Sequence, residues 1–212
     1  MCLCGPTGAY ILLDGTDCDD DAFAVNPGAP EVPDNNIDDN CNGMTDEDPV
    51  VFQEDFDDGA ANGWSFSSTN GSVVWHVSSY RKHSAPNSLA CSNPSSHSYN
   101  YGTTNAAATT PSITLPAVPP GQTLVLKFRI DPLNDSSDYG SWDQFTVTGG
   151  GSTLWQKGSD QLTAIPDWQE QALNLNALAG QTTQFTFRFN TKDSAHNNGE
   201  GVYIDDVIIE IE

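Results

Sequence analysis

The chain has 212 residues, with 29 Asp or Glu against 7 Lys or Arg, and a formal net charge of -22 at pH 7. A chain this acidic is repelled by nucleic acid and by anionic membrane surfaces, so nucleic acid is not expected as a partner. No apolar run reaches the roughly 18 residues that span a bilayer, which argues against membrane insertion. The length suits one β-sandwich with a small additional module.

The acidic residues concentrate at the N-terminus. Residues 1–50 hold 12 Asp or Glu and no Lys or Arg. Because packing so many carboxylates into a fold without a cation is repulsive, bound metal is expected there. We place a domain boundary at Asp48 and Pro49, with an irregular acidic cation-binding repeat at 1–48 and a β-sandwich at 49–212.

Cysteine usage points to an oxidising, extracellular setting. An odd number of cysteines leaves one thiol free or in an intermolecular bridge. The five are Cys2, Cys4, Cys18, Cys41 and Cys91.

The acidic repeat contains a loop with oxygen ligands at alternate positions, followed by a glycine that permits a sharp turn. Asp38, Asn40, Asn42, the Met44 carbonyl and Asp46 match the first positions of an EF-hand-like calcium loop. The Glu expected at position twelve is replaced by a proline, so other carboxylates must complete the shell. The candidates are Glu47, Asp17, Asp19, Asp21 and Asp34. Ca²⁺ is the expected cation, because magnesium demands a stricter octahedron and transition metals prefer His or thiolate ligands. The alternative is an acidic linker of Asx turns.

The same stretch resembles the metal-binding repeat of bacterial surface proteins that is named after a copper-binding member. The matching segments are Cys4–Ile11, Asp17–Asp20, Asn26–Glu31, Asp38–Gly43 and Asp46–Glu47. The resemblance implies an extracellular bacterial protein with a cation-dependent module.

One departure from this family affects the cysteines, because Pro33 stands where the family usually has a cysteine. Cys18–Cys41 is then the first choice for a disulfide and Cys4–Cys18 the second, and Cys2 could substitute. Copper is a minor alternative to calcium, since residues 1–75 contain no His.

Downstream of Pro49 the sequence predicts about ten short strands separated by Gly, Asn, Ser and Pro, which is typical of a sandwich. They are expected at 51–56, 73–78, 88–91, 107–115, 123–130, 144–148, 153–156, 168–174, 183–190 and 201–212. Within them apolar residues alternate with polar ones, so one face is buried and one is wet. No helix is expected beyond one possible turn at 173–179.

The segments Val51–Asp57 and Gly201–Val207 resemble those of jelly-roll modules in secreted bacterial proteases and adhesins, which are related to MAM-type and carbohydrate-binding domains. In such folds the first and last strands are neighbours. This would bring Glu54 and Asp55 close to Asp205 and Asp206 and form a second structural calcium site, with a solvated acidic edge as the alternative.

Exposed aromatic rings in polar loops are the candidates for glycan stacking. They are Tyr80, Tyr99, Tyr101, Tyr139 and Trp142, of which the site prediction retains Tyr99, Tyr101, Tyr139 and Trp142. The other four tryptophans are expected in the core.

No catalytic constellation is present, and the four histidines stand apart from any nucleophile, so an enzyme is not expected. The sequence therefore predicts a non-catalytic, calcium-stabilised module at the cell surface or outside the cell, for adhesion or for binding a glycan or a surface protein. The alternative is a subunit of a calcium-dependent filament or surface layer that binds copies of itself through the apolar run at 9–13 or an intermolecular disulfide.

Overall fold

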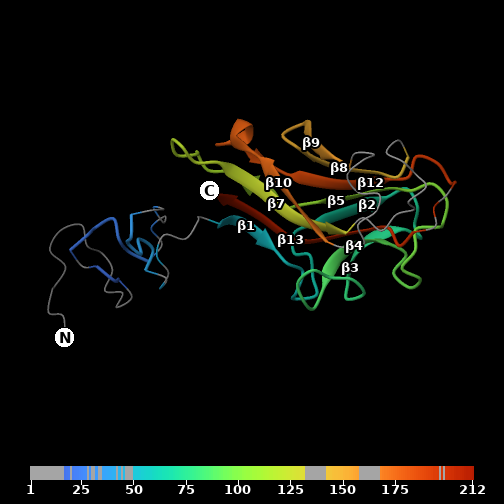
Figure 1. Ribbon diagram of the computed structural model, residues 1–212, viewed down its shortest axis with the longest axis horizontal. Coiled ribbons are helices and arrows are strands. Elements are labelled where there is room, and N and C mark those ends of the chain that lie inside the picture. The colour runs from blue at the N-terminus through green and yellow to red at the C-terminus, as the bar shows by residue number, and fades with distance from the viewer. Residues whose placement is uncertain are drawn as a thin grey trace. The chain divides into compact units, whose positions relative to one another are not determined.

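The computed structural model divides into two compact units, Met1–Pro49 and Val50–Glu212. The structure describes residues 17–19, 21–27, 29, 32, 35–41, 43, 45, 50–131, 142–157, 168–195, 197 and 199–212. The first unit consists of turns and bends in its described part, and the second is a two-layer β-sandwich (Figure 1). The prediction of an all-β jelly-roll sandwich is confirmed.

One layer of the sandwich is a six-stranded sheet of order β10-β7-β13-β4-β3, in which β1 also pairs with β13. All its pairings are antiparallel. The strands are β1 (Val50–Glu54), β3 (Val74–Ser78), β4 (Ser88–Ser92), β7 (Leu124–Asp131), β10 (Gln169–Asn174) and β13 (Val202–Ile211).

The other layer is a five-stranded antiparallel sheet of order β2-β5-β12-β8-β9. It comprises β2 (Ser65–Ser68), β5 (Asn105–Thr109), β8 (Gln144–Gly149), β9 (Ser152–Gln156) and β12 (Phe185–Asn190). A two-stranded ribbon joins β6 (Ile113–Thr114) to β11 (Thr182–Thr183). In the described residues the helical element is one 3-10 turn, η1 (Asn176–Leu178), and no helix there is long and apolar enough to cross a membrane.

The core lies between the two sheets and is rich in aromatic rings. Phe187 of β12 meets Phe128 of β7 edge to face, with ring centroids 5.3 Å apart, and so joins the two layers. Phe145 and Trp64 contact the same ring. Burying each large apolar side chain contributes about 1.5–3 kcal/mol, so this cluster is the main source of sandwich stability.

A close approach of two strands requires glycine at position 201. Gly201 has a φ of +97°, and a Cβ there would lie 2.1 Å from the Cys91 carbonyl oxygen. Any other residue would push the start of β13 away from β4.

The predicted strands match the observed ones with three differences. β2 is not predicted from the sequence, because four residues with three serines give no apolar alternation. The strand predicted at 107–115 is broken by Pro111, which cannot donate to a ladder, and the one at 183–190 divides at Gln184.

Candidate metal and ligand sites

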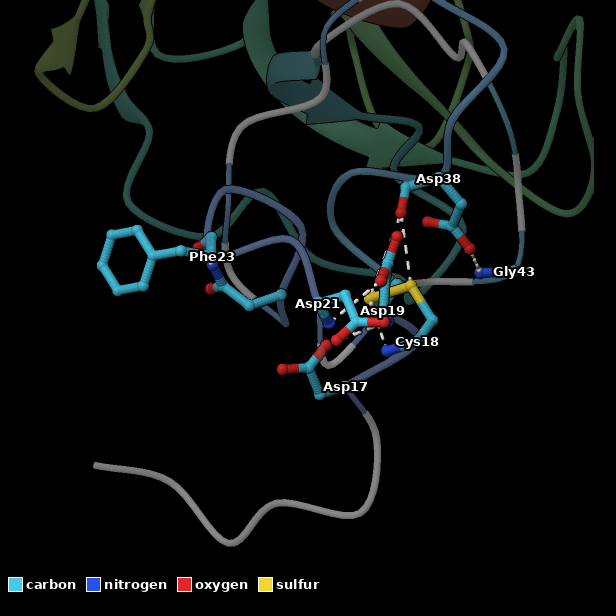
Figure 2. Close-up of a disulfide and its surroundings, with 9 residues drawn as sticks. Asp17, Cys18, Asp19, Asp21, Phe23, Asp38 and Gly43 are labelled. Carbon is cyan, nitrogen blue, oxygen red and sulfur yellow. Dashed lines mark hydrogen bonds between the residues drawn. A yellow bond between two sulfur atoms is a disulfide. The ribbon is translucent and has the colours of Figure 1, made fainter. Parts of the chain in front are cut away.

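A disulfide joins the two acidic segments of the N-terminal unit. Cys18 and Cys41 are bonded, with their Cα atoms 5.5 Å apart, which confirms the first-choice pairing. The backbone N–H of Cys18 also donates to the Cys41 sulfur at 3.1 Å. The bridge brings Asp17, Asp19 and Asp21 to the same neighbourhood as Asp38 (Figure 2).

The upstream acidic segment is folded by its own carboxylates. The backbone N–H of Asp19 donates to Asp17 Oδ1, and that of Asp21 donates to Asp19 Oδ1, both at 3.1 Å. These are Asx turns, in which each carboxylate uses one of its two oxygens. The turns place the three side chains around Cys18 (Figure 2), with Asp19 and Asp21 exposed and Asp17 partly buried.

The downstream loop closes on its first residue. The Gly43 N–H donates to Asp38 Oδ2 at 2.9 Å, and Gly43 has a φ of +94° that favours glycine. This is the sharp turn that the calcium-loop pattern predicts at its sixth position. Asn40 lies within the turn. The predicted ligands Asp34, Asn42, Met44, Asp46 and Glu47 fall outside the described residues.

The neighbouring Asp39 stabilises the turns of the repeat by accepting hydrogen bonds. It is buried, and its Oδ2 accepts hydrogen bonds from the Val32 N–H at 3.1 Å and from Asn35 Nδ2 at 2.6 Å. Its carbonyl accepts the Asn26 N–H at 2.9 Å. Asp39 therefore organises the turns of the repeat from within.

The donor chemistry of the repeat suits a hard cation. Its described side chains offer carboxylate and amide oxygens, while the sulfurs of Cys18 and Cys41 are consumed in the disulfide. Such oxygen ligands fit calcium, and a copper site would want imidazole or thiolate. Among the described residues, no three His, Cys, Asp or Glu side chains form a ready metal centre.

The predicted second calcium site lies where the first and last strands pair. Glu54 of β1 is opposite Val207 of β13, so the two strands are neighbours as expected. Glu54 Oε1 accepts the Phe56 N–H at 3.0 Å, and Asp55 Oδ1 accepts the Asp57 N–H at 3.0 Å. Burial raises the pKa of Glu54, and the nearby Asp58 and Asp55 raise it further.

The two carboxylates of β13, Asp205 and Asp206, contact the segment at His83 and Ser84. Asp205 is buried, and its oxygens accept the N–H groups of His83, Ser84 and Asp206 at 2.8, 3.1 and 2.9 Å. Burial raises the pKa of Asp205 to about 6, against these hydrogen bonds. Asp206 has a φ of +47° at a register shift, and its Oδ2 lies 2.5 Å from His83 Nδ1.

The turn at 83–87 contacts Asp205 and Asp206 of β13 and also Asp57, which follows β1. It meets Asp205 and Asp206 through His83 and Ser84, and it meets Asp57 through the Asn87 N–H, which donates to Asp57 Oδ1 at 3.2 Å. The structure thus gives each of the four predicted carboxylates its own hydrogen-bond partner. The second calcium site stays a prediction.

One predicted ligand-binding residue is wrong. Tyr99 is fully buried, its hydroxyl donates to Asp143 Oδ2 at 2.5 Å, and its ring packs edge to face on Phe189. It cannot serve as an exposed platform, because a buried partner satisfies its polar end and the core takes its ring. Tyr101 and Trp142 are 44% and 47% exposed, and Tyr139 lies outside the described residues.

A hollow of about 480 Å³ lies along the edge strand β3. Tyr80 is 51% exposed there, and its ring stacks on that of His97 with centroids 3.8 Å apart and an angle of 5°. The lining residues are His76, Val77, Ser78, Ser79, Tyr80, Pro94 and His97. The two histidines are not predicted as site residues from the sequence, since nothing in the spacing of residues 76, 80 and 97 indicates that the loop after β4 returns to β3.

The outward face of the five-stranded sheet carries hydroxyl side chains, in contrast to the aromatic hollow beside β3. A row of hydroxyl side chains crosses all five strands in register, and the hydroxyls of Thr109 and Thr186 lie 3.0 Å apart. The row is Ser65, Thr109, Thr186, Thr148 and Thr153. The face is polar and has no stacking ring in this row.

Comparison with known proteins gives a family match within the N-terminal repeat. Residues 17–47 match the model of the Cu-binding MopE metal-binding motif. The chain is similar to part of bacillopeptidase F of Bacillus subtilis, with 28% identity over 161 residues, which is 74% of this chain. The chain spans 10% of the length of that relative.

Solved structures similar to the chain include carbohydrate-binding and adhesin domains and a cyclase. One is from a study of carbohydrate-binding modules of the β-sandwich superfamily, at 18% identity and a TM-score of 0.47, covering 73% of this chain and 60% of that one. Another is the K1 cleaved adhesin domain of Lys-gingipain from Porphyromonas gingivalis, at 16% identity and a TM-score of 0.47, covering 76% and 96%. A third is a xylan-binding domain, at 14% identity and a TM-score of 0.42, covering 76% and 94%.

Proposed function

We propose that this chain is a non-catalytic extracellular module, in which the N-terminal repeat binds Ca²⁺ and the sandwich binds a glycan or a surface protein. The observation that carries the proposal is the Cys18–Cys41 disulfide, which ties an exposed acidic segment to a loop that closes on Asp38. Such a bridge forms and persists in oxidising compartments. The oxygen ligands that it gathers are those that calcium prefers.

The ligands for that ion would come from both tethered segments. Asp38 and Asn40 offer side-chain oxygens from the closed loop, and Asp17, Asp19 and Asp21 offer them from the Asx turns. Calcium takes six to eight oxygens, so the two segments together supply more of the shell than either does alone. The cation would neutralise carboxylates that otherwise repel one another.

Isothermal calorimetry tests the proposal, with CaCl₂ titrated into the wild-type chain and into Asp38→Asn. We expect saturable binding by the wild type and about a tenfold loss of affinity in the variant, because one anionic ligand is removed and the closing turn is weakened. Asp193→Asn is the matched control, since this carboxylate lies in the sandwich and, among the described residues, accepts a local hydrogen bond from the Ala195 N–H. No heat from calcium, or tighter binding of Cu²⁺ than of Ca²⁺, would contradict the calcium assignment.

One of the cysteines is excluded from the intermolecular disulfide of the filament alternative, while Cys2 and Cys4 lie outside the described residues. Cys91 lies fully buried in β4, and burial raises the pKa of its thiol, so it offers no exposed sulfur for a bridge to a neighbouring chain. The apolar run at 9–13 lies outside the described residues. Light scattering with calcium and then with chelator separates a monomeric binder from a calcium-dependent assembly.

A further inference from the structure

The hollow beside β3 contains a half-exposed aromatic ring with one face already covered. Tyr80 is 51% exposed, while the His97 ring lies flat against it. The exposed part of the Tyr80 ring is therefore available for contact with another flat apolar surface. A tyrosine ring presents a large apolar surface together with a polar hydroxyl, which suits a ligand that is apolar on one face and polar at its edge.

The loop that carries His97 is fixed by Asn93. The Asn93 side chain accepts the N–H groups of Ser95 and Ser96, both at 3.0 Å, and its Nδ2 donates to the Ser72 carbonyl at 2.9 Å. The His97 N–H donates to the Asn93 carbonyl at 2.9 Å, and His97 takes a φ of +54°. A residue held in the left-handed region needs such support, so these hydrogen bonds fix the backbone that carries the His97 ring.

A second exposed tyrosine flanks the same loop. Tyr101 is 44% exposed, and its hydroxyl lies 3.0 Å from the Ser96 hydroxyl. Since Ser96 and His97 are adjacent in the chain, the rings of Tyr80 and Tyr101 lie around one short segment. Two tyrosines beside polar hydroxyls make an amphipathic surface, apolar on its rings and polar between them.

The polar groups of the hollow favour a neutral ligand that donates hydrogen bonds. None of its seven lining residues is Asp, Glu, Lys or Arg. His76 Nδ1 donates to the Val74 carbonyl at 3.1 Å, which leaves a lone pair on Nε2 of the neutral ring. In the described part of the chain, His76 Nε2 and His97 Nδ1 are both buried without a hydrogen-bond partner. Burial lowers the pKa of His76, so its ring is neutral near pH 7.

We infer that this hollow is a docking site for a neutral saccharide. The apolar face of a sugar ring would lie on Tyr80, and a sugar hydroxyl would donate to an imidazole nitrogen once the Tyr80–His97 pair shifts to uncover it. The inference rests on the proposed binding function and assigns it to a defined surface. A phosphorylated or carboxylated ligand fits less well, because the hollow has no cation to pair with it.

Imidazole NMR of the histidine-labelled wild-type chain tests the site without any substitution. The probes are β-1,4-galactotriose, xylotriose and N,N′,N″-triacetylchitotriose, all of which are neutral. With one of them, the His76 and His97 signals should move saturably while the His83 signal, from the ring that faces Asp206, stays in place. Movement of His83 alone, or of no histidine with any probe, would overturn the inference.

Three variants test the same site by affinity. Tyr80→Ala and His97→Ala should each weaken binding of the responsive probe by about tenfold, as loss of a stacking partner implies. Tyr80→Phe, which keeps the ring, should bind as the wild type does and covers the case in which Tyr80→Ala fails to fold. The matched control is Phe66→Ala, a ring 43% exposed on β2 of the other sheet, which should leave affinity unchanged.

The outcomes separate this inference from the proposed function. If a probe binds and both the Tyr80→Ala and His97→Ala chains bind it as tightly as the wild type, the site is wrong and the module still binds a glycan. If none of the three probes binds, the saccharide site and the glycan part of the proposed function both fail. The calcium part is measured separately by calorimetry and is affected by neither result.

Discussion

The N-terminal unit and the sandwich obtain their order from different sources. In the described part of residues 17–45, only Val25 and Asp39 are buried, and a disulfide with carboxylate-to-backbone hydrogen bonds provides the structure. The sandwich instead buries a continuous cluster of Phe, Leu, Ile and Val side chains between two sheets. A small segment that cannot build an apolar core needs cross-links and ligands, and a larger one does not.

Removing an aromatic ring from the core should have the largest effect, and it should affect the stability of the sandwich alone. Phe187→Ala deletes the side chain that contacts Trp64, Phe128 and Phe145, and large-to-small core changes of this kind cost about 3–5 kcal/mol. Urea denaturation followed by tryptophan fluorescence measures this loss, because all five tryptophans lie in the sandwich at positions 64, 75, 142, 155 and 168. Calcium affinity of the folded variant should remain as in the wild type, and a cost below about 1 kcal/mol would contradict the assignment of this ring to the stabilising core.

Removing the disulfide should instead affect the N-terminal unit and leave the stability of the sandwich unchanged. The double substitution Cys18→Ser and Cys41→Ser releases a bridge with a sequence separation of 23, which the chain-entropy model values at about 3 kcal/mol. We expect calcium binding to fall sharply in calorimetry while the sandwich denaturation midpoint stays unchanged. A large drop in that midpoint would show that the two units share their stability.

The buried carboxylate of the sandwich gives a pH-dependent test. Burial raises the pKa of Asp205 from 3.8 to about 6, so the folded state holds this proton more tightly than the unfolded state. Its contribution to stability is therefore complete below about pH 3.8 and is lost as the pH rises through about 6, a change of about 3 kcal/mol. In chelator, the free energy of unfolding of Asp205→Asn relative to wild type should rise between pH 4 and 7, and a falling difference would contradict the burial argument.

The smallest expected effect concerns the hollow. Burial lowers the pKa of His76 below its ordinary value of 6.5, so the stability that the neutral ring contributes is present above pH 6.5 and is lost as the pH falls through the lowered pKa. The wild type should lose more stability between pH 7 and 5 than His76→Gln does. If the free energy of unfolding changes equally with pH in the two chains, His76 is solvated in the folded state and the burial argument is contradicted.

The prediction of exposed aromatic platforms shows where sequence reasoning ends. Tyr99 and Tyr101 lie in the same serine- and asparagine-rich stretch, and composition does not distinguish them. The structure buries Tyr99 on Asp143 and Phe189 and leaves Tyr101 at the surface. Which of the two rings turns inward depends on residues about 44 and 90 positions further along the chain, and local pattern does not contain that information.

The hydrogen-bond partners of Asp205 are a second feature that local sequence pattern does not predict. The pairing of the first strand with the last followed from the two end segments and was predicted, but the residues that satisfy Asp205 come from the turn at 83–84. Side chains that alternate along one strand are easy to assign to a face. Their partners across the sheet depend on a crossover and on a register shift at Asp206, which periodicity does not specify.

The sequence by itself determined the all-β class, most strand positions, the acidic N-terminal repeat and the Cys18–Cys41 pairing. The first three follow from short-range signals, namely alternation, turn residues and the spacing of oxygen ligands, whereas the cysteine pairing was the first choice implied by the resemblance to the metal-binding repeat and its departure at Pro33. The tertiary structure alone decided that Tyr99 is a core residue, that Asp205 clamps the turn at 83–84, and that His76, Tyr80 and His97 share one hollow. Each of these depends on contacts between segments far apart in the chain, which only the packing of the two sheets and their loops brings together.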